Sequence, residues 1–283
     1  VYSNILQLKN KIVDYKNKLQ INAVIDPEED LQSYYSYFCK KKKSVNYQEI
    51  LADSEVFEKF YEMENGKEVV CVPAGGVDLQ CLWKDGKMNI IVCGSVDNGK
   101  LSAVNGSDKC FGARFKAGKV PETIRRHIGI LMNNRIPLKQ IQDTAFLEKY
   151  MKEDLLMEQK ADIMLQLFEH SIQSEENALV SFLIHHIEKQ KGHVLVSQLV
   201  EETGYSHRYV NHIFKKNMGC SIKHFAGIER MQAGIQYLLE QRDDEIYSEL
   251  GYYDQAHFIK DFKKFTTVTP NSFKKDAEKF AMM

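Results

Sequence analysis

The sequence predicts an α+β protein, with an antiparallel β barrel or sandwich and flanking helices in its N-terminal part and an all-α C-terminal part. Two observations support this division. Residues 69–118 contain short β-rich runs separated by Gly, Asn and Asp, a pattern typical of small antiparallel domains. From residue 196 onward, apolar residues instead recur at helical spacing between glycines that suit helix ends. The C-terminal part is therefore expected to contain two helix-turn-helix motifs joined by one long helix.

The first helix-turn-helix motif is expected between Ser197 and Phe225. Gly204 stands where the first helix must end with a positive φ angle, which glycine adopts without steric cost. Ser206 can cap the next helix by accepting a backbone N–H, and Gly219 ends that helix. The apolar face of this second helix consists of Val210, Ile213 and Phe214. Its candidate DNA-contacting residues are Ser206, His207, Arg208, Asn211, His212 and Lys215.

These residue types suit a DNA-binding surface. Arg and Asn can form bidentate hydrogen bonds with guanine and adenine edges, and Lys can contact phosphates. The alternative is a helical hairpin in an all-α bundle, whose polar residues only face water.

A second motif of similar design favours DNA binding, and it is expected at residues 245–273. Gly251 occupies the position that Gly204 has in the first motif, and Thr269 can cap a final helix with Pro270 in its first turn. Residues 222–239 can form one helix between the motifs. Two motifs joined in this way would present two recognition helices to successive segments of the major groove, roughly 34 Å apart.

Residues 176–280 resemble the C-terminal DNA-binding domain of the AraC/XylS family of bacterial transcription regulators. The segments GYSHRYVNHIFKK and GYYDQAHFIKDFKK, the latter followed by VTPNSF, carry the resemblance. The base-reading residues that it implies are Arg208, Asn211 and His212 in the first recognition helix and Gln255, Ala256 and Lys260 in the second. His257 is implied to contact a base or the DNA backbone, and Lys263 occupies the position of Lys215.

The departures from the family pattern affect mainly the second motif. Val200 and Tyr247 stand where the family usually has a small Ala. Thr267 replaces the usual Gly before VTP, and a β-branched residue suits a positive φ poorly. Residues 239–251 are shorter than the family norm and keep a charged run at residues 242–245. We therefore expect the second motif to be distorted or to contribute less to base reading.

The N-terminal part is expected to combine helices with the β-rich region. Residues 2–20 predict an amphipathic helix, packed on its own domain or in a dimer contact. The stretch Lys84-Asp85-Gly86-Lys87 predicts a tight hairpin turn. Helices are also expected at residues 122–130 and 147–168. The apolar face of the latter would consist of Met151, Leu155, Leu156, Ile163, Met164, Leu167 and Phe168.

The segments VPAGGVDL, GARFKAG and RIPL resemble the cupin-like sensory domains of some regulators of this family. Cupin enzymes bind their metal through two or three His and a Glu, but residues 1–126 contain no His. We therefore expect neither a metal nor a cofactor. The candidate ligand-binding residues are Asp78, Trp83 and Arg114. Trp83 could stack on a planar ligand or belong to the core, whereas the two charged residues could pair with each other or face a ligand.

The predicted organisation therefore has four parts. An N-terminal amphipathic helix covers residues 1–24, and a β-rich, cupin-like effector or dimerisation domain covers residues 25–120. A helical linker or dimerisation region follows at residues 121–172, and an AraC-type DNA-binding domain covers residues 173–283.

The composition is that of an ordinary soluble globular protein, with 43% hydrophobic and 27% charged residues. Neither a transmembrane segment nor a signal peptide is expected. The six cysteines lack metal-site spacing, which is typical of reduced cytosolic thiols. The formal net charge is −1, so a DNA-binding face must concentrate the basic residues that contact phosphates.

These observations predict a cytoplasmic bacterial transcription regulator and not an enzyme, because no P-loop, dinucleotide-binding or Ser-His-Asp pattern is present. Its expected partners are double-stranded promoter DNA and, for an activator, RNA polymerase, and it is expected to form a homodimer. We expect a small-molecule effector to act on the N-terminal domain. The alternative is control by protein partners or oligomerisation, with a filled β domain and a degenerate second helix-turn-helix motif.

Overall fold

The computed structural model describes residues 46–64, 69–102, 109–168 and 177–281. All of them belong to one compact unit, residues 33–283. The helix predicted for residues 2–20 lies outside the described residues. In the part of the chain that is described, no helix is long and apolar enough to cross a membrane.

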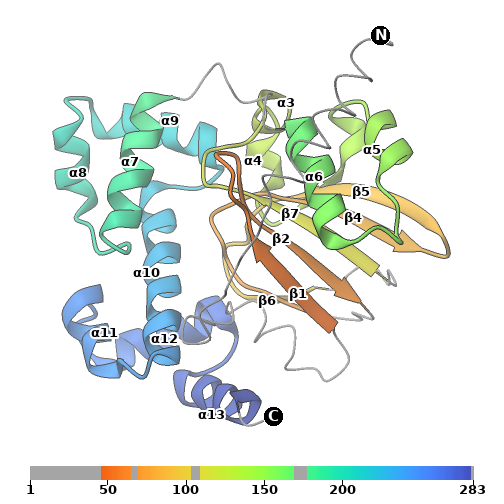
Figure 1. Ribbon diagram of the computed structural model, residues 1–283. Coiled ribbons are helices and arrows are strands. Elements are labelled where there is room, and N and C mark those ends of the chain that lie inside the picture. The colour runs from red at the N-terminus through yellow and green to blue at the C-terminus, as the bar shows by residue number, and fades with distance from the viewer. Residues whose placement is uncertain (1–45, 65–68, 103–108, 169–176, 282–283) are drawn as a thin grey trace. The chain divides into compact units, whose positions relative to one another are not determined.

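The N-terminal part contains the predicted antiparallel sheet (Figure 1). Six strands have the order β1-β2-β7-β4-β5-β8, and β3 and β6 form a separate two-stranded sheet. Their bounds are β1 Asn46–Leu51, β2 Phe57–Glu64, β3 Val69–Cys71, β4 Asp78–Lys84, β5 Lys87–Cys93, β6 Lys100–Ser102, β7 Lys109–Phe115 and β8 Arg135–Pro137. Because β1 and β8 are the outer strands, the six described strands form an open sheet and do not close on themselves.

The predicted hairpin turn is confirmed between β4 and β5. Lys84 pairs with Lys87, and the two residues between them both have positive φ, 50° at Asp85 and 70° at Gly86. Two successive positive φ angles match the twist of the flanking strands, and Asp-Gly tolerates them.

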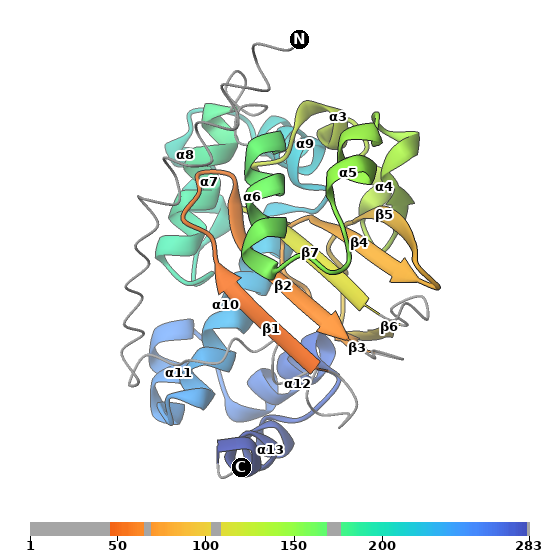
Figure 2. The same ribbon diagram turned by 45° about the vertical axis from the view of Figure 1, so that its right-hand side comes forward.

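One face of the sheet packs against α6 (Met157–Phe168), which crosses β2 and β7 in Figure 2. The rings of Phe57 and Phe115 stack with centroids 4.7 Å apart, and Phe168 of α6 meets both rings edge-on. The shorter helices around this core are α3 Glu122–Arg125, α4 Ile128–Leu131, the 3-10 turn η1 Leu138–Gln140 and α5 Ala145–Tyr150.

Three details of this part differ from expectation. The helix expected at residues 122–130 is broken into α3 and α4 at Arg126 and His127. Leu156, expected on an apolar face, is 66% exposed because it precedes the start of α6. The strands β1 and β2 were not predicted, and apolar and polar residues do not alternate regularly along residues 57–64, FEKFYEME.

The C-terminal part is all helical, as predicted. It consists of α7 Ala178–Lys189, α8 Val196–Glu202, α9 His207–Met218, α10 Ile222–Leu239, α11 Asp243–Leu250, α12 Gln255–Thr266 and α13 Pro270–Ala281. The expected joining helix is confirmed as α10, which runs between the α8–α9 and α11–α12 pairs (Figure 1). Phe225 of α10 belongs to the core of the first pair, whereas Ile235 belongs to the core of the second.

Candidate nucleic-acid interface

Helix α9 has one buried face and one exposed polar face. Its N-terminus is capped by the Ser206 hydroxyl, which accepts a hydrogen bond from the Tyr209 N–H at 3.3 Å. Val210, Phe214 and Met218 are buried. The exposed predicted contact residues are Ser206, His207, Arg208, His212 and Lys215. Asn211 is half-buried, and its amide donates a hydrogen bond to the His207 carbonyl at 3.1 Å. The helix therefore offers five exposed candidates and one whose amide is partly occupied.

Helix α12 repeats this arrangement. Asp254 caps it by accepting the His257 N–H at 2.7 Å, and its buried face contains Phe258, Phe262 and Phe265. The predicted contact residues on this helix are all exposed: Gln255, Ala256, His257, Lys260 and Lys263. His257 Nε2 lies 3.7 Å from a carboxylate oxygen of Asp261, one turn further along the helix. Both candidate recognition helices therefore present their predicted residues to solvent.

The turn before each of these helices has the predicted glycine geometry. Gly204 has φ 71° and Gly251 has φ 67°. At Gly251 an added Cβ would also lie 2.3 Å from Nε2 of His193, so the His193 ring would have to move. His193 in turn is bonded through Nδ1 to the Glu249 carbonyl at 2.8 Å.

The shortened segment before α11 does not prevent this helix from forming. Its first turn contains Asp243, Asp244 and Glu245, whose negative charges are favourable at a helix N-terminus. Arg242 bridges Glu240 and Glu245, and Lys274 of α13 pairs with Asp243. The expected distortion is therefore not seen in the order and length of the helices in the second motif.

Thr267 adopts a left-handed backbone conformation, which is unfavourable for a β-branched residue. It ends α12 with φ 68°, as Gly219 ends α9 with φ 76°. The N–H of each residue bonds to the carbonyl four residues earlier, on Lys263 and Lys215, at 2.9 Å. The fold therefore imposes the same cap on both helices although only one has glycine there.

The C-terminal ends of α9 and α12 both touch the N-terminal part of the chain. Gly219, after α9, lies against Ile128 of α4. At the end of α12, the Gly99 N–H donates to the Lys264 carbonyl at 3.0 Å. On α10, a carboxylate oxygen of Asp97 lies 3.5 Å from Nε2 of His224. These contacts leave the N-terminal halves of α9 and α12 exposed.

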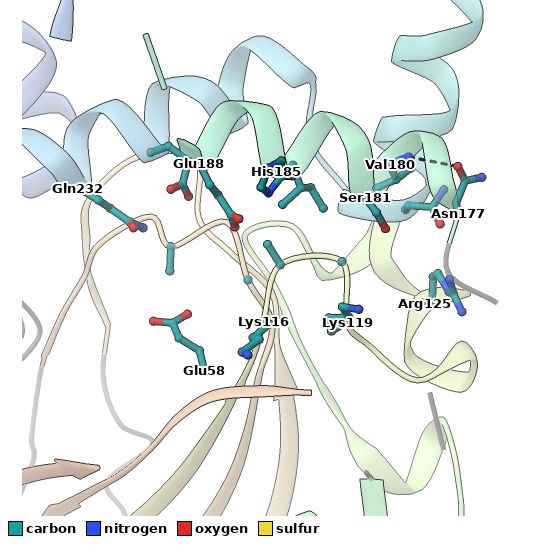
Figure 3. A pocket seen from close by; sticks show the side chains of 17 residues that line it. Glu58, Lys116, Lys119, Arg125, Asn177, Val180, Ser181, His185, Glu188 and Gln232 are labelled. Atoms are coloured by element: carbon teal, nitrogen blue, oxygen red, sulfur yellow. Dashed lines mark hydrogen bonds between the residues drawn. The ribbon is translucent and has the colours of Figure 1, made fainter. Parts of the chain in front are cut away.

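A cavity of about 530 Å³ lies beside these helices, between α7, α10 and the loops that flank the sheet. Figure 3 shows Glu58 and Lys116 on one side of it and His185 and Glu188 of α7 on the other. Glu229 of α10 also lines the cavity, and it lies deeper than Glu58 and Glu188, which are exposed. Burial, reinforced by the charges of Glu188 and Glu58, raises the pKa of Glu229 to about 8.

The residues predicted to bind a ligand are engaged in internal contacts. Asp78 and Arg114 form the bidentate ion pair that was expected, with N–O distances of 2.7 and 2.8 Å. Trp83 is 3% exposed and lies in the core, with Nζ of buried Lys160 5.2 Å from its ring centroid. None of these three residues lines the described cavity. Among the residues that the structure describes, no group of three His, Cys, Asp or Glu could bind a metal ion.

Comparison with known proteins adds an independent assignment of the C-terminal part. A family model described as a helix-turn-helix domain matches residues 199–276. The C-terminal domain of AraT, a response regulator from Geobacillus stearothermophilus, is 25% identical and covers 36% of this chain and 88% of its own, with a TM-score of 0.34. ToxT from Vibrio cholerae O395 is 12% identical over 83% of this chain and 99% of its own, with a TM-score of 0.42.

Comparison with curated proteins found no match to this chain. The family model spans both pairs, from Leu199 of α8 to the last helix, and the two pairs show matching caps, glycine turns and exposed residues. The C-terminal part of this chain therefore contains a helix-turn-helix domain in which two helix pairs are joined through α10.

Proposed function

We propose that this chain is a sequence-specific regulator of transcription that binds double-stranded promoter DNA through α9 and α12. The observation that carries the proposal is the pair of capped helices with exposed polar faces, joined through the single helix α10. In this proposal Arg208, His212, Gln255 and Lys260 read base edges, Asn211 and Ala256 read adenine and a thymine methyl, and Lys215 and Lys263 contact phosphates.

The remaining candidate DNA-contacting residues are assigned roles from their positions on the two helices. Ser206 and His207 lie in the first turn of α9, and His257 lies in the first turn of α12, where a helix in the major groove approaches the DNA. Lys215 and Lys263 lie further along their helices and contribute to phosphate contacts. The chain acts in the cytoplasm as a homodimeric activator that contacts RNA polymerase.

Control by a small molecule fits the contacts between the β-rich part and the recognition helices. A ligand that favours one arrangement of these parts would change DNA affinity by its differential affinity for the two arrangements. A second possibility is control by protein partners. The internal pairing of Asp78 with Arg114 and the burial of Trp83 favour it, because they fill the region where a ligand was first expected. Thermal shifts across a metabolite panel separate the two: a shift supports an effector, and its absence supports a protein partner.

DNA binding is tested by selecting bound duplexes from a random pool and measuring affinity by fluorescence titration. Arg208→Ala is expected to weaken specific binding by about 1–3 kcal/mol and to relax base preference at one position. Lys139→Ala removes an equal charge from an exposed site in η1 and serves as the matched control. Failure to select any consensus, or equal affinities of the Arg208→Ala and Lys139→Ala variants, would contradict the proposal.

A further inference from the structure

The turn between α7 and α8, residues 191–193, contacts both helix-turn-helix motifs, and we call it the α7–α8 turn. It has two successive positive φ angles, 50° at Lys191 and 72° at Gly192. The Gly192 N–H donates to the Ile187 carbonyl at 2.8 Å and so closes the end of α7. Val194, which follows directly, packs against the core of the first motif. The α7–α8 turn is therefore anchored in the first motif.

His193 connects this turn to the second motif. Its ring donates a hydrogen bond from Nδ1 to the Glu249 carbonyl of α11 at 2.8 Å, and the α7–α8 turn faces α11 in Figure 1. The same ring lies against Gly251. Gly251 ends α11 with φ 67° and sets the direction in which the chain continues toward α12. His193 therefore contacts the second motif at the point that orients its recognition helix.

Lys191 makes a second connection, through Tyr237 of α10. The Lys191 ammonium donates to the Tyr237 hydroxyl, which donates to the carboxylate of Glu249. Nζ of Lys191 also lies 3.6 Å from this carboxylate. Tyr237 is buried in the core of the second motif. The α7–α8 turn therefore holds Glu249 both at its backbone carbonyl, through His193, and at its carboxylate.

Gly192 brings the α7–α8 turn into backbone contact with α10. An added Cβ would lie 2.1 Å from the Ala226 carbonyl oxygen and 2.4 Å from the Arg230 backbone nitrogen. The Arg230 guanidinium in turn lies 4.9 Å from the ring centroid of Tyr252, and one of its nitrogens lies 3.9 Å from the carboxylate of Asp261 in α12. The contacts that begin at the turn therefore continue through α10 to the second recognition helix.

A second connection between the motifs restricts how they can move. A long helix is rarely straight and curves gently, so α10 alone would leave the two recognition helices some freedom to rotate relative to each other. The α7–α8 turn adds contacts at α11 and Gly251 that oppose this rotation. Two linked binding elements gain affinity from each other only where their geometry lets both bind at once. A rigid pair of recognition helices therefore selects the separation of two DNA segments as well as their sequences.

We propose that Lys191 and His193 are positioning residues that fix α12 relative to α9, so that the chain binds two DNA segments at one separation. Neither residue belongs to the recognition helices, and both side chains are exposed, so replacing them should cost little stability. The selection of a DNA separation rests on the proposed function, whereas the fixed geometry of the two helices does not.

The geometry is tested in the full chain without DNA, by single-molecule fluorescence energy transfer between dyes at the exposed positions Lys216 of α9 and Lys263 of α12. The double variant Lys191→Ala/His193→Ala is compared with Lys189→Ala/Gln190→Ala, which removes the same charge from exposed positions directly before the turn. We expect a broader distribution of transfer efficiency in the first variant, and the same distribution in the second as in the parent. An unchanged distribution in the first variant would overturn the proposal.

The selection of a separation is tested with duplexes that carry one to five extra base pairs between the two recognised segments. Each base pair moves the second segment by about 3.4 Å and turns it by about 35° around the duplex. The parent and the control variant are expected to lose about tenfold or more in affinity when two base pairs are inserted, and Lys191→Ala/His193→Ala about threefold or less. Partial unfolding would weaken binding to every duplex by the same factor, so the ratio of affinities reports the geometry.

The two measurements separate this proposal from the proposed function. If none of the proteins selects a duplex, the proposed function fails, and the fluorescence measurement still decides whether the α7–α8 turn fixes the two helices. If the parent binds its selected duplex and all three proteins respond equally to the inserted base pairs, DNA binding stands and the role of Lys191 and His193 is rejected.

Discussion

The two helix-turn-helix motifs share one backbone design, but they reach it from unequal sequences. The first motif ends α9 at Gly219, for which a φ of 76° is unstrained, whereas the second ends α12 at Thr267 with φ 68°. A β-branched residue in this conformation costs about 1–2 kcal/mol. The second motif therefore folds against a local penalty that the first does not have.

Other contacts of the second motif offset this penalty. The Thr266 hydroxyl donates to the Phe262 carbonyl at 2.6 Å, and the ion pair between Lys274 and Asp243 connects α13 to α11. Phe262 also meets Phe258 and Phe273 edge-on in a buried aromatic cluster. Packing around the shared helix α10 can therefore impose a positive φ on Thr267, a residue type that disfavours this conformation.

The largest expected effect comes from the two cores. Phe214→Ala in the first motif and Phe262→Ala in the second each remove a fully buried ring and should reduce the free energy of unfolding by about 3–5 kcal/mol. Because the two rings belong to different clusters, hydrogen exchange should rise mainly in α8 and α9 for the first variant and in α11 and α12 for the second. Tyr253→Ala, at a side chain that is 93% exposed, is the control. Equal exchange in both motifs for either variant would show that they are not separate units.

The stability of the protein is expected to depend on pH through Glu229 of α10, the helix that the two motifs share. The raised pKa of Glu229 means that the folded state binds its proton more tightly than the unfolded state does. The contribution of Glu229 to the free energy of unfolding is therefore greatest below about pH 4.5 and falls as the pH rises toward 8. Without ligand, Glu229→Gln should stabilise the protein at pH 8 by on the order of 2 kcal/mol and much less at pH 5. Thermal unfolding of this variant and of Glu202→Gln, the matched control at an exposed position of α8, measures the difference, and an equal effect at both pH values would contradict it.

Exchanging the residues that end α9 and α12, Gly219 and Thr267, tests how much strain each cap carries. Gly219→Thr should destabilise the first motif by about 1–2 kcal/mol, because it adds strain at positive φ and places a Cβ 3.0 Å from the Ile128 carbonyl oxygen. Thr267→Gly should stabilise the second motif by less than about 1 kcal/mol, because glycine also gains freedom in the unfolded chain. Chemical denaturation measures both. Opposite signs are expected, and a destabilising Thr267→Gly would show that the threonine side chain has a role of its own.

The sequence predicted most accurately the features that depend on local conformation. Gly204, Ser206 and Gly219 specify where helices start and end, because φ and capping are properties of single residues. The pairing of Asp78 with Arg114 was also predictable, since two charges in apolar strands need a partner. β2 was missed because a bulge between Phe57 and Lys59 interrupts the alternation of apolar and polar residues.

The cavity could not have been predicted from the sequence. Its three carboxylates lie at residues 58, 188 and 229 and meet only through tertiary packing. Glu229 sits in a long helix whose apolar residues gave no sign that this carboxylate would line a cavity. The pairing of β3 with β6 could not be predicted either, because strands of three residues carry too little pattern to specify a partner.

The central claim is that α9 and α12 both contact DNA. Hydroxyl-radical footprinting of a selected duplex tests it most directly. Two protected segments about one helical turn apart are predicted, with Arg208→Ala weakening protection at one segment and Lys260→Ala at the other. A single protected segment that responds to Arg208→Ala and not to Lys260→Ala would contradict the claim that the second motif binds DNA.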